Sequence, residues 1–107
     1  MSDDIAKLEE TADNLSALSE RWADKGEDEK ALELSNQAVA LRDQITQLKA
    51  KRRADMTASP EWAALAGHMD ALNAQAQKTS GDLEDVMGNI ETAKSLVSGL
   101  TKLVTLL

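Results

Sequence analysis

Residues 83–107 read LEDVMGNIETAKSLVSGLTKLVTLL, and their apolar side chains recur at alternating steps of three and four. The repeat is carried by Leu83, Val86, Ile90, Ala93, Val97, Leu100, Val104 and Leu107. Because an α-helix turns about once every 3.6 residues, this spacing lines one side of a helix and is typical of a packing seam. The sequence therefore predicts a helix over residues 82–106 that packs against other helices.

The preceding part of the chain repeats this spacing in three further stretches, which predict helices over residues 3–24, 27–56 and 60–78. Their seam positions, in chain order, are Ile5, Leu8, Ala12, Leu15, Leu18 and Trp22; Ala31, Leu34, Ala38, Leu41, Ile45 and Leu48; and Trp62, Leu65, Met69, Leu72 and Ala76. Gly26 separates the first two helices, since glycine tolerates the left-handed backbone that ends a helix. Ser59 and Pro60 open the third, because serine caps a helix and proline suits its first position. A break at residues 79–81 precedes the last helix.

The second helix is expected to continue as far as Met56. Four cations, Lys49, Lys51, Arg52 and Arg53, then fall near its end, where positive charge favours the negative end of the helix dipole. A contact with nucleic acid or anionic lipid is the alternative role for this basic cluster. The helix-end interpretation is favoured, because no aromatic side chain lies nearby to stack on bases.

The composition indicates an all-α protein. The chain has 107 residues, the length of one domain, and we expect a single helical-bundle domain over residues 1–107. Trp22 and Trp62 are its only aromatic residues, and Cys, Phe and Tyr are absent, which disfavours a β-sandwich or a disulfide scaffold. Short connections favour antiparallel neighbours, so we predict an antiparallel bundle of about four helices with coiled-coil-like seams. An open pair of helical hairpins is the alternative.

The charge of the chain disfavours nucleic acid as a partner. Nineteen Asp and Glu against twelve Lys and Arg give a net charge of -7, which repels nucleic acid over most of the surface. The sequence contains neither a typical signal peptide nor an apolar run of the roughly 20 residues that a membrane span needs. We therefore expect a cytoplasmic protein, although a protein exported by a dedicated system would have a similar sequence.

The sequence contains no recognisable catalytic motif. His68 is the only histidine and there is no cysteine, so a zinc site of several imidazoles or thiolates cannot be built within one chain. Carboxylate groups such as Asp82, Glu84 and Asp85 lie in a predicted first helical turn, where acidic residues favour the dipole. We expect no enzyme activity, no cofactor, no metal site and no catalytic residue.

The C-terminal helix is the expected interaction surface, because residues 92–107 carry many apolar side chains and no acid. The surface residues predicted are Val86, Ile90, Val97, Leu100, Leu103, Val104 and Leu107. One short chain poor in large side chains is not expected to bury every seam, so we expect a homo-oligomer or a complex with another protein. The alternative is a central helix of the bundle, contacted on two sides.

Three functions are consistent with these features. The first is a non-enzymatic protein that acts by protein–protein contact through the C-terminal helix. The second is a small acidic inhibitor or immunity-type protein, phage or bacterial, which blocks a basic site on an enzyme or a nucleic-acid-binding complex. The third is a membrane-active or secreted effector that uses residues 92–107, although its two lysines are few for an anionic surface.

Residues 18–41 place an aromatic residue, a turn glycine, two small residues and a late apolar residue at set intervals, namely Trp22, Gly26, Ala31, Ala38 and Leu41. This quarter of the chain resembles one tetratricopeptide helical hairpin. The resemblance implies two closely packed antiparallel helices. Asp43 stands where that family often ends its second helix with proline, and no second copy follows at about 34 residues. The groove formed by stacked repeats is therefore not expected.

Overall fold

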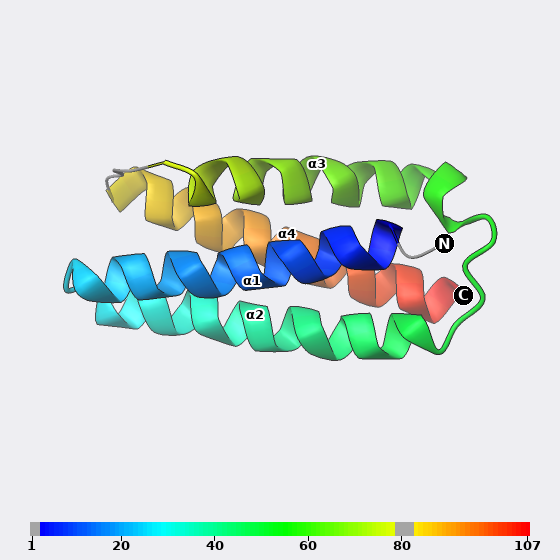
Figure 1. The fold of residues 1–107 in the computed structure, drawn as a ribbon, viewed down its shortest axis with the longest axis horizontal. Coiled ribbons are helices and arrows are strands. Elements are labelled where there is room, and N and C mark those ends of the chain that lie inside the picture. Colours follow the sequence, from blue (N-terminus) through cyan, green and yellow to red (C-terminus); the bar gives the residue numbers. More distant parts are fainter. Residues whose placement is uncertain (1–2, 79–82) are drawn as a thin grey trace.

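The first two helices form a hairpin in the computed structural model, which describes residues 3–78 and 83–107 (Figure 1). α1 spans Asp3–Asp24 and α2 spans Asp28–Lys49. Gly26 adopts a φ of 84°, the left-handed conformation predicted for the turn. The backbone N–H groups of Gly26 and Glu27 donate to the last carbonyls of α1, at 3.0 and 2.9 Å.

The other two helices form a second hairpin, in which α3 spans Pro60–Ala76 and α4 spans Leu83–Leu106. The predicted start of α3 is confirmed, because the Ser59 hydroxyl accepts from the Trp62 N–H at 3.1 Å and Pro60 occupies the first turn. The predicted break at residues 79–81, and Asp82 after it, lie outside the described residues.

The prediction that the second helix reaches Met56 is wrong, because α2 ends at Lys49. The apolar stripe of α2 has its last buried member at Leu48. Three and four residues later the same side of the helix carries Lys51 and Arg52, whose charges are costly to bury. The chain therefore leaves the helix. Met56 lies at the start of a short 3-10 turn, Met56–Ala58, and packs into the core with 1% of the Met56 surface exposed.

The end of α2 is capped by a side chain that follows it. Arg53 Nη1 donates to the carbonyl oxygens of Leu48 at 3.0 Å and of Lys49 at 3.2 Å. These carbonyls belong to the last turn of a helix, which leaves its final C=O groups without partners inside the helix. Arg53 Nε also lies 3.7 Å from the carboxylate of Asp4, at the start of α1.

The two hairpins pack face to face, and successive helices run in opposite directions, which confirms the predicted four-helix bundle (Figure 1). The sequence did not predict that α1 lies beside α3 and α2 beside α4, so that neighbours across the hairpins run parallel. Polar contacts of α1 with α3 advance along both helices: Lys7 with Asp70 at 2.9 Å, Asn14 with Asn73 at 2.7 Å, and Arg21 with the carbonyls of Gln75 and Ala76 at 3.0 and 2.7 Å. Residues 50–59 thus cross the end of the bundle diagonally.

The predicted seams supply most of the core. Every seam residue of the first two helices is buried, as are Trp62, Leu65, Met69 and Leu72 of α3, while Ala76 is partly buried. On α4 the buried side is wider than predicted, because α4 contacts both α2 and α3. A second buried stripe, spaced by seven residues, consists of Asn89, Leu96 and Leu103, whereas Val97 is only partly buried.

Gly99 permits the close packing of α3 on α4. A Cβ atom at Gly99 would lie 2.7 Å from Leu65 Cδ2, and Leu65 is itself buried. Toward the other end of the same helix, a Cβ atom at Gly88 would meet no neighbouring atom within 4 Å. A side chain at residue 99 would therefore force Leu65 to move, whereas one at residue 88 would not.

Replacing Gly99 with valine is expected to lower the free energy of unfolding by about 1–3 kcal/mol, because the new side chain overlaps Leu65. Gly88→Val is the matched control and is expected to leave the stability unchanged or slightly higher, since valine favours helix more than glycine does. Urea denaturation followed by circular dichroism measures both variants. Equal effects of the two substitutions would contradict the close contact.

Candidate interaction site at the end of the bundle

The structure places most of the predicted interaction surface inside the molecule. Val86, Ile90, Leu100, Leu103 and Val104 are buried, and Val97 is partly buried. These side chains contact the other helices of the same chain and would meet a partner only if the bundle opened. Leu107 is the one member of the set that is exposed, with 39% of its surface accessible.

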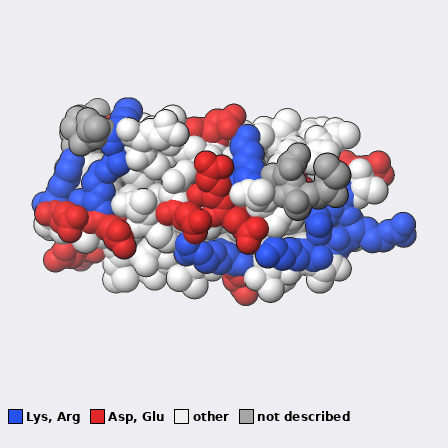
Figure 2. All heavy atoms as spheres, viewed as in Figure 1, with Lys and Arg blue, Asp and Glu red and all other residues white. Residues whose placement is uncertain are grey.

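Acidic and basic side chains are interspersed over the face of the bundle that Figure 2 shows. Acidic side chains lie over the α1–α2 turn with basic side chains beside them, and further long basic side chains project from the opposite end. At the turn, Glu20, Asp24, Asp28 and Glu29 are exposed, and none of them forms an ion pair with another described residue. Residues 20–30 carry five acidic and three basic side chains, so the turn has a small excess of negative charge.

Two exposed leucines follow one another where α4 ends. Leu106 is 63% exposed and is adjacent to Leu107. The other large apolar side chains exposed among the described residues are Leu32 and Val39 on α2 and Met87 on α4. Leu106 and Leu107 border a hollow.

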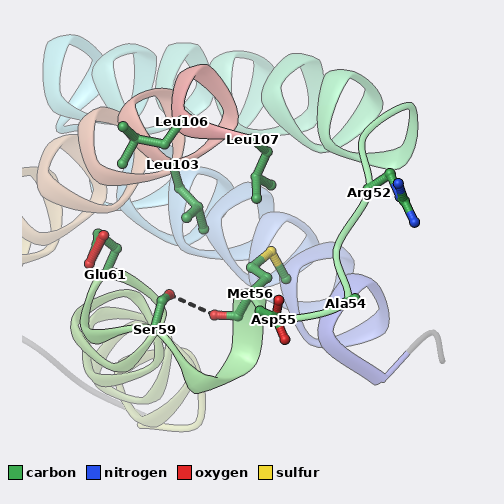
Figure 3. A pocket seen from close by; sticks show the side chains of 9 residues that line it. All are labelled: Arg52, Ala54, Asp55, Met56, Ser59, Glu61, Leu103, Leu106 and Leu107. Atoms are coloured by element: carbon green, nitrogen blue, oxygen red, sulfur yellow. Dashed lines mark hydrogen bonds between the residues drawn. The ribbon is translucent and has the colours of Figure 1, made fainter.

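The hollow has a volume of about 340 Å³ and lies between the end of α4 and residues 52–61 (Figure 3). Its apolar lining comes from Met56, Leu103, Leu106 and Leu107. Its charged lining comes from Arg52, Asp55 and Glu61. We call these seven residues the terminal patch.

The connection between α2 and α3 is held in place beside this patch. The Ser59 hydroxyl, which caps α3, also donates to the Met56 carbonyl at 2.6 Å (Figure 3). Met56 is buried, so this hydrogen bond fixes the start of α3 to a residue that fills the end of the core. The terminal patch is formed by two segments that lie far apart in the sequence, residues 52–61 and residues 103–107.

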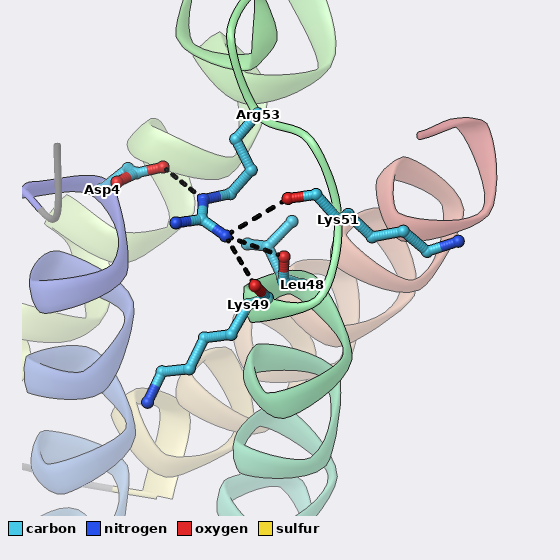
Figure 4. Close-up of polar contacts among 5 residues, drawn as sticks. All are labelled: Asp4, Leu48, Lys49, Lys51 and Arg53. Atoms are coloured by element: carbon cyan, nitrogen blue, oxygen red, sulfur yellow. Dashed lines mark hydrogen bonds and ion pairs between the residues drawn. The ribbon is translucent and has the colours of Figure 1, made fainter.

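The predicted basic cluster does not act as one group. Lys49 pairs with Glu9 of α1 at 3.3 Å, and Arg53 folds back on the end of α2 (Figure 4). Lys51 and Arg52 are exposed, and in the described part of the chain neither side chain has an ion-pair partner. Arg52 is the only member that lines the hollow.

The acidic and histidine side chains of the described residues are scattered. Across residues 3–78 and 83–107, His, Asp and Glu do not gather in a group of three or more that could hold a metal ion. His68 is half-buried on α3, and its neighbours one turn away, Ala64 and Leu72, have no polar side-chain atom to orient an imidazole. Within the same described helices, none combines the length and the apolar content needed to cross a membrane.

Comparison of the chain with protein-family models, with curated proteins and with solved structures finds no match.

Substitution of Leu100 by Asp is expected to unfold the bundle, because it buries a charge in the core at a cost of about 4 kcal/mol or more. Leu107→Asp is the matched variant, directly after the same helix, and is expected to keep its helicity, since an exposed side chain changes stability by about 0.5 kcal/mol or less. Circular dichroism at 222 nm distinguishes the two. Full helicity in Leu100→Asp would show that this side chain faces outward in solution.

Proposed function

We propose that the protein is a non-enzymatic interaction protein that associates with a second copy of itself through the terminal patch. The observation that carries the proposal is the pair of exposed leucines, Leu106 and Leu107, beside a hollow with a partly apolar lining. Adjacent exposed leucines lose contact with water when they are covered, which favours association. As in the sequence-based prediction, the C-terminal helix makes the contact between proteins. The contacting residues, however, lie at the end of this helix and not along its buried seam.

The charges of the terminal patch support a second copy as the partner. A two-fold interface brings the same surface of both copies together, so each charge must face an opposite charge from the same set. Arg52 provides the positive charge, and Asp55 and Glu61 provide negative charges, around a common apolar lining. The patch is small, so the association is expected to be weak and dependent on concentration.

The double variant Leu106→Asp, Leu107→Asp is expected to be monomeric at concentrations where the wild-type protein forms dimers, because two carboxylates replace the apolar contact. Light scattering over a range of protein concentrations measures the mass. The control is Leu32→Asp, Val39→Asp, which alters two exposed apolar side chains on α2 and is expected to dimerise as the wild type does. A wild-type protein that stays monomeric up to about millimolar concentration would refute self-association by this patch.

Charge reversal gives an independent test of the two-fold arrangement. Arg52→Glu is expected to weaken the dimer about tenfold or more, because like charges then face each other across the interface. Adding Glu61→Arg to that variant is expected to restore much of the affinity, since opposite charges are again available. Failure of the second substitution to restore any affinity would argue against a pairing of these two residues between copies.

A second candidate function is supported by the acidic end of the molecule. Asp24, Asp28 and Glu29 lie exposed around the α1–α2 turn without ion-pair partners among the described residues. Exposed carboxylates grouped at a helix turn suit an inhibitor that occupies a basic site of another protein.

The triple variant Asp24→Asn, Asp28→Asn, Glu29→Gln removes three negative charges from this turn and is expected to weaken binding to a polylysine peptide. The control variant neutralises Glu10, Asp43 and Glu91, which gives the same total charge, and is expected to weaken that binding less. Calorimetric titration at two salt concentrations measures both variants. Equal losses in the two variants would show that only the net charge matters and that the turn is not a specific site.

A further inference from the structure

The bend after α2 occurs where the local sequence favours helix. Residues 50–55 read AKRRAD, and the next helix-breaking residue is Pro60. Alanine, lysine and arginine are among the best helix formers, and the segment contains no glycine. Ala50 itself has φ -84° and ψ -3°, close to helical values. The bend is therefore imposed by contacts with the rest of the bundle.

Most contacts that hold the bend closed are local, because they join residues of the segment to one another or to the last turn of α2. Arg53 Nη1 donates to the carbonyls of Leu48, Lys49 and Lys51 at 3.0, 3.2 and 3.4 Å (Figure 4). Arg53 Nε is buried and makes no hydrogen bond in the structure, and its nearest anionic group, on Asp4, lies at 3.7 Å. The segment is also held by the burial of Met56 and by the hydrogen bond from the Ser59 hydroxyl to the Met56 carbonyl at 2.6 Å.

The interface between the two hairpins does not require that both belong to one chain. It consists of contacts of α1 with α3 and of α2 with α4. Its polar contacts include the Lys7–Asp70 pair at 2.9 Å and the Glu33–Lys94 pair at 3.8 Å, each with one member on either hairpin. A second copy offers the same hairpin surfaces, so it can supply the same interface without any new contact.

We infer that residues 50–58 can straighten into a continuation of α2, which lets the α3–α4 hairpin of one copy pack on the α1–α2 hairpin of another. The result is a domain-swapped dimer, in which identical elements are exchanged between copies. The straightened segment would join the two halves of the dimer, and its side chains Lys51, Arg52, Arg53 and Asp55 suit a helix surrounded by water. Each copy loses the burial of Met56 and the contacts of Arg53, and gains helical residues.

This dimer does not depend on the proposed function, and the two assemblies exclude each other. Straightening removes Asp55, Met56 and Ser59 from the hollow beside Leu106 and Leu107. A patch-mediated dimer exchanges chains quickly, because its surface is small and no helix must detach. A swapped dimer exchanges chains only when a hairpin leaves its partner, which requires opening of the core.

The test begins with full-length protein unfolded in urea and refolded at about millimolar concentration, followed by light scattering after dilution. A dimer that persists on dilution is expected. Native mass spectrometry of isotopically heavy and light dimers is expected to show mixed dimers only after renewed unfolding and refolding. Leu106→Asp, Leu107→Asp is expected to retain this slow dimer while it loses the rapid one.

Two variants shift the dimer in opposite directions. Arg53→Ala is expected to raise the dimerisation constant about tenfold or more, because two hinges each lose charged hydrogen bonds present only in the bent form. Ala50→Gly, Ala54→Gly is expected to lower the constant by about tenfold or more, since glycine opposes the straight helix.

Circular dichroism checks that each hinge variant folds, and if Arg53→Ala does not, the glycine variant decides alone. An absence of slow dimer from both the wild type and a folded Arg53→Ala would overturn the inference. So would a dimer that mixes its chains within minutes, or one that the two glycines leave unchanged.

Discussion

The apolar stripe of α2 ends at Leu48, and the remaining architecture depends on this limit. The positions that would continue the stripe carry Lys51, Arg52 and Asp55, whose charges cannot enter the core at an acceptable cost. The helix therefore ends at Lys49, although its local sequence favours continuation. Tertiary packing decides where this helix ends, with Arg53 closing its last turn.

The bend determines how the two hairpins meet. It carries Met56 into the end of the core and leads the chain diagonally to Pro60, so that α3 comes to lie beside α1 instead of α2. The same segment forms one side of the terminal hollow, whose other side is the end of α4. The candidate site and the candidate hinge are consequently parts of one structure, and a change in the bend alters both.

Much of the fold follows from the spacing of apolar residues. The first helix was predicted over residues 3–24 and is observed as Asp3–Asp24, and Ser59 caps α3 as its sequence indicated. The end of α2 could not be predicted from propensity, because the burial of Met56 and the contact of Arg53 with Asp4 involve residues distant in sequence. A single heptad seam also could not show that α4 is packed on two sides.

The site was less predictable than the fold, for the same reason. The seam of α4 was predicted as an interaction surface. An apolar side of a helix packs against any apolar neighbour, however, and here α2 and α3 of the same chain cover the seam. Leu103 and Leu107 belong both to the predicted surface and to the terminal patch. Of these two, only Leu107 is exposed.

The central claim is that one chain buries its own seams by bending after Lys49. This claim is tested most directly by small-angle X-ray scattering at a dilution where the mass is that of a single chain. The account predicts a compact particle, close to the 13.6 Å radius of gyration and 42 Å length of the Cα trace. A radius of roughly 20 Å or more would contradict it, because that value indicates two hairpins joined by a straight helix.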